Sequence, residues 1–277
     1  MASLQALKKH LGSVRMTGQL AGAMKTVSAV KLSRVNGTLQ NFSAYDTMCR
    51  EILNTFSTEL AAVYPCVNPE APVCYVLLGA NRGLCGGYNI ELYSYADTVL
   101  AEAPENRLLI AVGKHAVSHL NDAGTPPDKT WLLPDTVTMD DCEPLIRDVL
   151  TMYREGRISA VILLYQKFVN MLTQTPSSFR LLPLAETEQS RSEEAPLFVP
   201  DSTTVLQSAA SACLNAAFYT RILEVCAGHQ ASTLIAMRSA YDNAEASAAA
   251  LESDISRKRQ SDVTASVIET SGSIPES

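Results

Sequence analysis

The chain has 277 residues, of which 47% are hydrophobic and 18% charged, and its formal net charge is −7. This balance excludes a disordered chain, and no apolar run approaches the roughly 18 residues of a membrane-spanning helix. The seven cysteines form no C-x-x-C pair, which is typical of buried thiols in a reducing compartment. The amino-terminal segment has no continuous apolar run, so we interpret it as mature chain rather than as a secretory signal.

Proline is unevenly distributed along the chain. Twelve of the 13 prolines lie between Pro65 and Pro200, and the other is Pro275. Because proline breaks helix interiors, its absence from 1–64 and 201–274 permits a long helix at each end. We expect an N-terminal coiled-coil helix (1–64), an α/β domain (65–200) and a C-terminal coiled-coil helix (201–277).

The N-terminal part has the apolar spacing of a coiled coil. Steps of three and four residues dominate, with one wider gap across Gly18. Residues 1–45 hold six basic residues and no acid, a pattern that fits binding to nucleic acid, anionic lipid or an acidic protein surface, or simply a solvated helix face. The expected seam is Leu4, Leu7, Leu11, Val14, Leu20, Met24, Val27, Val30, Val35, Leu39, Phe42, Tyr45, Cys49, Ile52, Phe56 and Leu60.

The middle of the chain alternates strand and helix signals. The run VCYVLLGA, for example, is apolar throughout, as in a strand that is buried on both faces. Such alternation predicts a Rossmann-like open α/β domain with a largely parallel sheet. The expected strands are 73–80, 106–112, 159–165 and 179–184, and the expected helices are 88–100, 114–120 and 138–155.

The C-terminal part has a second, alanine-rich seam and a basic run, Arg257-Lys258-Arg259. Neither terminal helix is apolar all round, so each needs a partner. We expect the two to pair as a long antiparallel coiled coil. The C-terminal seam is Val205, Ala209, Ala212, Phe218, Ile222, Val225, Leu234, Met237, Tyr241, Ala244, Ala248, Leu251 and Ile255.

A glycine-rich stretch, GANRGLCGGYN at residues 79–89, follows the first expected strand. It lacks both the G-x-G-x-x-G and the P-loop spacing, so we interpret it as a tight structural turn with Cys85 as a small buried residue. His115 and His119 lack the acid of a zinc-protease motif. We therefore expect no catalytic residue, no metal site and no cofactor.

Several motifs together resemble the gamma subunit of F-type ATP synthases. GLCGGYN (Gly83–Asn89) is similar to the signature turn of that family, and GQLAGAMKTVSAVKL (Gly18–Leu32) to its first helix. AMRSAYDNA (Ala236–Ala244) and Arg259-Gln260 are similar to its last helix, and EGRISAVILLYQKFVNMLTQTP (Glu155–Pro176) to its α/β domain. The resemblance follows the family's order over nearly the whole chain.

The resemblance implies a non-catalytic rotor of a divergent bacterial ATP synthase. Its implied partners are the alpha and beta subunits, the epsilon subunit and the c-ring, with no nucleic acid and only indirect membrane association. The implied location is peripheral, on the cytoplasmic face of the plasma membrane. The implied ring contacts are Met24, Lys25, Arg257, Arg259 and Gln260, with Met24 and Lys25 paired near Arg259 and Gln260. The implied structural turn contains Gly83, Cys85, Gly86 and Gly87.

The chain departs from the family pattern at two places. Leu20-Ala21-Gly22 replaces the usual I-T-K, and Ala265-Ser266 replaces Gln-Glu ahead of a polar tip. The residues alone do not exclude two other classes of function. One is an α/β ligand-binding module on a coiled-coil stalk, and the other is a basic coiled-coil protein on nucleic acid or membrane.

Overall fold

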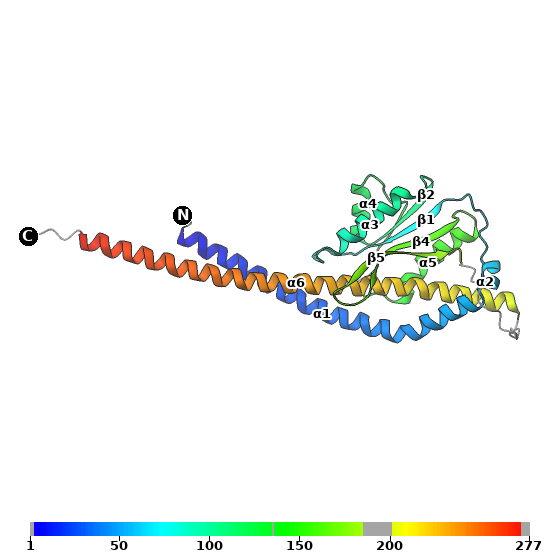
Figure 1. Cartoon of the computed structure of the whole chain (residues 1–277), viewed down its shortest axis with the longest axis horizontal. Helices are drawn as coiled ribbons and strands as arrows, with labels where there is room; N and C mark the ends of the chain where they lie inside the picture. The colour runs from blue at the N-terminus through cyan, green and yellow to red at the C-terminus, as the bar shows by residue number, and fades with distance from the viewer. Residues whose placement is uncertain (1–2, 135, 185–200, 273–277) are drawn as a thin grey trace, which may run out of the picture. The chain divides into compact units, whose positions relative to one another are not determined.

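The computed structural model describes residues 3–134, 136–184 and 201–272 (Figure 1). The chain forms two compact units, one of Met1–Ala29 with Thr233–Ser277 and the other of Val30–Ser232. Two long helices, α1 (Leu4–Thr55) and α6 (Ser202–Gly272), contribute to both units. The long terminal helices and the central α/β fold expected from the sequence are confirmed.

The larger unit holds a five-stranded sheet in the order β3-β2-β1-β4-β5. The first four strands are parallel, and β5 runs antiparallel to β4. The strand β3 was not predicted, because its three residues, KTW, carry no apolar run. The strands are β1 (Val73–Leu78), β2 (Arg107–Val112), β3 (Lys129–Trp131), β4 (Ala160–Phe168) and β5 (Gln174–Leu182).

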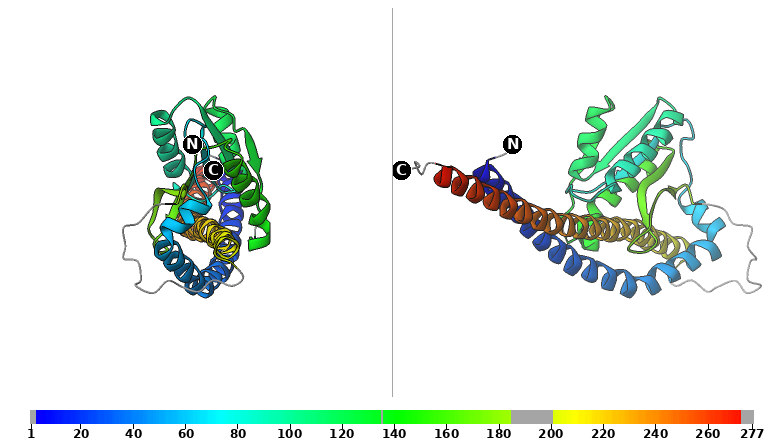
Figure 2. Two further views of the ribbon diagram at one scale, coloured as in Figure 1. Left: turned by 90° about the vertical axis from the view of Figure 1, so that its right-hand side faces the viewer. Right: turned by 60° about the vertical axis from the view of Figure 1, so that its left-hand side comes forward.

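Helices cover both faces of this sheet (Figures 1 and 2). On one face, α3 and α4 pack against β1 and β2, and on the other face α5 and α6 cover the sheet. A short helix, α2, was expected to continue α1 but begins after Phe56, whose backbone is not helical. The shorter helices are α2 (Ser57–Val63), α3 (Tyr88–Glu102), α4 (Lys114–Asp122) and α5 (Met139–Arg154).

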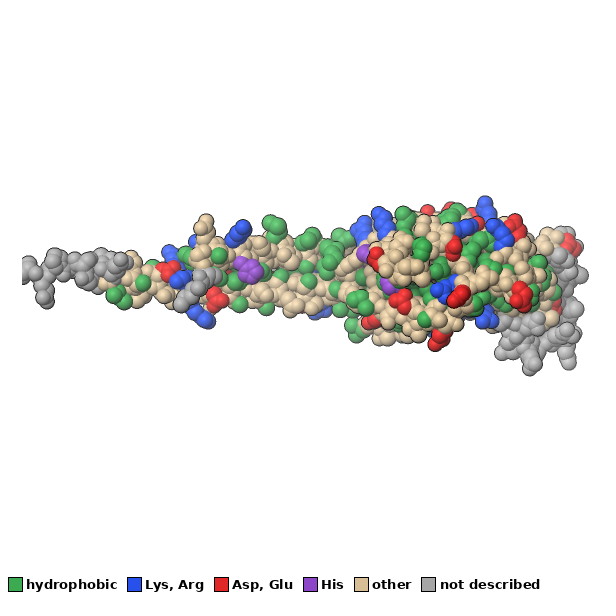
Figure 3. All heavy atoms as spheres, turned by 90° about the horizontal axis from the view of Figure 1, so that it is seen from above, with side chains coloured by type: hydrophobic (Ala, Val, Ile, Leu, Met, Phe, Trp, Pro, Cys, Tyr) green, Lys and Arg blue, Asp and Glu red, His purple; other side chains and the backbone are tan. Residues whose placement is uncertain are grey.

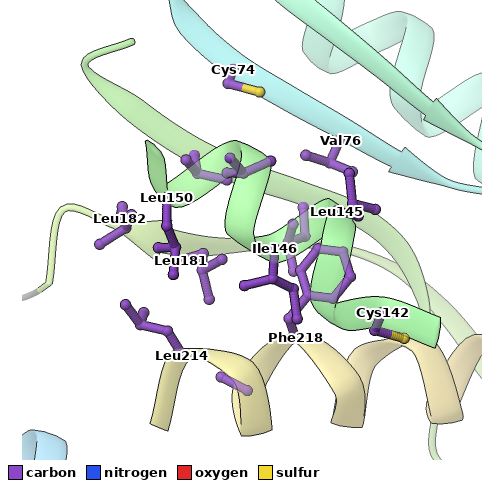
Figure 4. Packing of buried hydrophobic residues seen from close by; sticks show 14 of the residues in the cluster. Cys74, Val76, Cys142, Leu145, Ile146, Leu150, Leu181, Leu182, Leu214 and Phe218 are labelled. Atoms are coloured by element: carbon purple, nitrogen blue, oxygen red, sulfur yellow. The ribbon is translucent and has the colours of Figure 1, made fainter. Parts of the chain in front are cut away.

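The main core of this unit lies between β1, α5 and α6 (Figure 4). Val76, Leu145, Ile146 and Phe218 point into it, and all are fully or almost fully buried. Here α6 is enclosed on nearly every side, because it packs on the sheet and α5 while also pairing with α1 through Cys49 and Cys213. This arrangement explains why its apolar positions exceed a single seam.

The predicted seam of α1 is partly wrong. Leu20 and Val27 are 62% and 52% exposed, and Val30 is exposed as well. Over residues 4–29 of α1, the buried positions are instead the small residues Gly18, Ala21 and Ser28. Together with the half-buried Val14 and Met24, they follow one another at steps of three and four, so the wide step across Gly18 came from counting only large apolar residues.

Candidate functional site: the helical pair and the glycine-rich turn

In the smaller unit, α1 and α6 run antiparallel and approach closely at two glycines. A Cβ placed on Gly18 would lie 3.1 Å from the Cβ of Ala244, and one placed on Gly22 would lie 3.1 Å from Cδ2 of Tyr241. Larger side chains at either position would push the helices apart or displace the tyrosine ring. The glycines therefore set the spacing of the pair.

Two basic residues of α1 are bound by α6. The Arg15 guanidinium donates to Oε1 of Glu252 at 2.5 Å, and Nζ of Lys25 lies 4.4 Å from the centroid of the Tyr241 ring. The Tyr241 hydroxyl donates to Glu245 at 2.5 Å, and this hydrogen bond raises the pKa of Tyr241. Because these contacts are exposed, they define the register between α1 and α6 more than they stabilise the pair.

The expected register of the pair is wrong. Lys25 lies over Tyr241, whereas we expected Met24 and Lys25 to lie near Arg259 and Gln260. The two sites are separated by about 18 residues of α6, roughly 27 Å at 1.5 Å per residue. The contact set implied by the family resemblance therefore lies at two levels of the helical pair and does not form one cluster.

The basic run of α6 forms local ion pairs. Lys258 Nζ lies 2.9 Å from Asp262, and Arg257 lies 3.8 Å from Asp254. From Arg259 to Ile268 every residue is exposed. This part of α6 thus presents all its faces to other molecules.

Exposed apolar side chains lie on α1 of the smaller unit. Met16, Leu20 and Val27 recur at steps of four and seven, which places them along one face of the helix. Hydrophobic side chains are visible on the surface of the helices (Figure 3). A row of this kind is typical of an interaction surface, whereas isolated apolar side chains are not.

The glycine-rich turn after β1 has an unusual backbone. Leu84 has a φ of +61° and Gly86 a φ of +58°, whereas Gly87 is helical and Gly83 has only ordinary contacts. Of these glycines, only Gly86 has a backbone conformation that favours glycine over other residues. Cys85 is buried, and burial raises the pKa of its thiol, so this cysteine is unreactive.

Three hydrogen bonds join the turn to α6 of the same unit, and a fourth joins it to β4. Ser232 Oγ donates to the Cys85 carbonyl at 2.9 Å, and Tyr88 Oη donates to the Val225 carbonyl at 3.1 Å. His229 Nε2–H donates to the Arg82 carbonyl at 2.9 Å. Gln166 Nε2 completes the set by donating to the Tyr88 carbonyl at 3.1 Å.

His229 is neutral at pH 7 in this setting. Burial lowers its pKa, and the hydrogen bond to Arg82 opposes that effect only in part. Since Nε2 donates to a carbonyl, the neutral ring carries its proton on Nε2. The turn therefore acts as a structural clamp between the sheet and α6.

At the end of β2, the first two backbone amides of α4 are hydrogen-bonded within the protein. The Lys114 amide donates to Asn81 Oδ1 at 3.2 Å, and the His115 amide donates to the Ala80 carbonyl at 3.2 Å. A Cβ on Gly113 would lie 2.5 Å from the Gly79 carbonyl oxygen. The two turns thus cross in contact, and the first amides of α4 are used within the protein.

The two histidines of α4 do not form a metal site with each other. His119 Nε2 lies 2.9 Å from Asp97, and its ring stacks on Tyr93 at 4.5 Å, whereas His115 lies near Gly83. Over residues 3–134, 136–184 and 201–272, no three His, Cys, Asp or Glu side chains are grouped to hold a metal ion. No helix in these same ranges is both long and apolar enough to cross a bilayer.

An α/β body clamped onto paired terminal helices defines a stalk-type protein. The family model for ATP synthase matches residues 3–274. The chain is 27% identical to the ATP synthase gamma chain of Desulfitobacterium hafniense and 28% identical to that of Exiguobacterium sp., with 98% of each chain covered in both cases. The chain therefore belongs to the ATP synthase gamma family, as a non-catalytic subunit of the central stalk.

Solved structures share the fold at low identity. A chain of the Euglena gracilis mitochondrial ATP synthase (OSCP/F1/c-ring) has a TM-score of 0.71 at 16% identity, with 98% of this chain and 93% of that chain covered. A chain of the Tetrahymena thermophila mitochondrial ATP synthase (central stalk and c-ring) has a TM-score of 0.60 at 19% identity. That comparison covers 80% of this chain and 99% of the other.

Proposed function

We propose that this chain is the rotating axle of a bacterial F-type ATP synthase and transmits torque between the c-ring and the alpha/beta ring. Its further partner would be the epsilon subunit. The observation that carries the proposal is the helical pair of the smaller unit, with an exposed apolar row on α1 and a stretch of α6, residues 259–268, in which every residue is exposed. Such surfaces suit a helix pair enclosed by other subunits.

We propose two levels of ring contact on this pair. Met24 and Lys25 would act at the level of Tyr241, and Arg257, Arg259 and Gln260 would act about 27 Å further along α6. The arginines offer planar, permanently charged groups that suit carboxylates on the beta subunits. Two separated levels would hold the axle against tilting as well as against slipping.

The departure at Gly22 has a local reason in this account. A lysine there would meet the Tyr241 ring, which Lys25 already covers. Glycine in place of lysine at position 22 therefore leaves room for the Tyr241 ring on α6. We propose that Lys25 alone supplies the cationic contact at this level.

The proposed location is peripheral, on the cytoplasmic face of the bacterial plasma membrane. The similar gamma chains come from bacteria, and the described helices include none suited to span a bilayer. Attachment would then be indirect, through the c-ring.

The proposal is tested with the complex purified from cells through a tag on the beta subunit. We expect the chain to co-purify with alpha, beta and epsilon subunits. The double variant Arg259→Ala/Gln260→Ala should lower ATP-driven ion pumping per ATP hydrolysed in inverted membrane vesicles, with assembly retained. Arg238→Ala, also exposed on α6, is the matched control and should pump normally. Normal coupling in the double variant would contradict the placement of the second contact level.

A further inference from the structure

The larger unit contains a cavity that the rotor function does not use. It has a volume of about 140 Å³ and lies at the carboxyl ends of β1 and β2. Leu78 and Val112 from these strands line it, together with Val35 of α1 and Ile222 of α6. Its interior is therefore mainly aliphatic.

Cationic side chains also line this cavity. Lys31 and Arg34 come from α1, and Arg82 comes from the glycine-rich turn. None of the described lining residues is an Asp or a Glu; Asp135, next to the lining residue Pro134, lies outside the described residues. Arg34 is exposed, so its guanidinium can bind a ligand without first leaving a buried position.

The cavity walls are held in place by hydrogen bonds. Asn81 Nδ2 donates to the Leu133 carbonyl at 2.6 Å, and the Gly113 amide donates to the Trp131 carbonyl at 2.9 Å. The carboxyl ends of parallel strands are where open α/β sheets most often bind ligands. A pre-formed, mostly apolar cavity with a few polar groups is the usual form of a small-molecule site.

We propose that this cavity binds a small organic anion, in which one apolar ring or short chain carries a sulfonate, carboxylate or phosphate. The size is the first reason, because a cavity of about 150 Å³ is known to hold one benzene molecule. The charge is the second, because arginine forms strong paired hydrogen bonds with the oxygens of such groups. The ligand class goes beyond the proposed rotor function and does not depend on it.

The site joins three parts of the larger unit, namely α1, α6 and the turns at the strand ends. A ligand that binds only the folded state stabilises that state by mass action. An occupied cavity should therefore resist separation of the two helices from the sheet. Side chains would contact the anion, because the first two backbone amides of α4 are already hydrogen-bonded within the protein.

The test uses the full chain and a pair of probes that differ in charge, 4-fluorobenzenesulfonate and the neutral 4-fluorobenzenesulfonamide, followed by ¹⁹F NMR titration. We expect the sulfonate to bind one site per chain at least tenfold more tightly than the sulfonamide. Arg34→Gln should weaken sulfonate binding at least fivefold and leave the sulfonamide unchanged. Val35→Phe, which fills the cavity, should weaken both probes.

Arg180→Gln, an exposed arginine on β5, is the matched control for loss of one positive charge and should bind both probes as the wild type does. Equal affinity for the two probes would overturn the anion assignment. An equal effect of Arg34→Gln and Arg180→Gln would overturn the location, as would unchanged binding in Val35→Phe. Absence of saturable sulfonate binding to the wild-type chain would overturn the site as a whole.

Discussion

Three glycines of α1 in the smaller unit provide a graded test of the helix contact. Replacing glycine by alanine inside a helix stabilises it by about 1 kcal/mol where the new methyl group meets nothing. Gly12 has no atom within 4 Å of such a methyl group, so Gly12→Ala should show the full gain. At Gly18 the methyl would lie 3.1 Å from the Ala244 Cβ, a fixed group that can yield only if the helices move.

Overpacking of this kind costs about 1–3 kcal/mol, so Gly18→Ala should range from neutral to about 2 kcal/mol destabilising. Gly22→Ala should lie between the two, because the Tyr241 ring can rotate away. The assay is amide hydrogen exchange of residues 14–29, which reports local opening of this unit alone. A difference of about 1.4 kcal/mol between variants appears as a tenfold difference in exchange rate. If Gly18→Ala protects these amides as well as Gly12→Ala does, the close contact at Ala244 is wrong.

Three further predictions concern the register of the helical pair, the buried His229 and the C-terminal residues. In a background without native cysteines, Gly18→Cys/Ala244→Cys should form a disulfide readily, whereas Met24→Cys/Gln260→Cys should not; the reverse pattern on non-reducing gels would exclude the observed register. Burial lowers the pKa of His229 below the value of about 6.5 in unfolded chains, so its contribution to stability is complete above that pH and is lost as the pH falls. Urea unfolding should therefore show a steeper loss of stability below pH 6.5 in the wild type than in His229→Gln, and parallel curves would refute this role. Deleting residues 270–277 should leave ring assembly and ATP hydrolysis nearly unchanged, whereas deletion from Arg257 should lower both; loss of activity in the shorter deletion would show that the tip contributes.

Much of the fold was predictable because its signals are local. The position of proline separated the long helices from the α/β domain, and apolar runs such as Val73–Leu78 marked the buried strands. The strand β3 and the break at Phe56 carry no such signal, because they depend on pairing and packing with residues distant in sequence.

The register of the helical pair could not be read from the apolar pattern. Heptad spacing is the same after a shift of any whole number of heptads, so it defines a seam but not a register. Here the register depends on where small residues meet, as at Gly18 with Ala244, and on polar pairs such as Arg15 with Glu252. Tyr241 was on the predicted seam, but nothing in the sequence marked Lys25 as its partner.

The most direct test of the rotor account is rotation of the larger unit within the assembled complex. The alpha/beta ring is fixed to a surface through tagged beta subunits, and a bead is attached through Ser118→Cys on the exposed surface of α4, with Cys66 and Cys226 replaced by alanine. On addition of ATP, the account predicts continuous rotation of the bead in one direction, and inhibition of hydrolysis stops it. Sustained ATP hydrolysis by complexes whose beads stay stationary would contradict the claim that this chain is the axle.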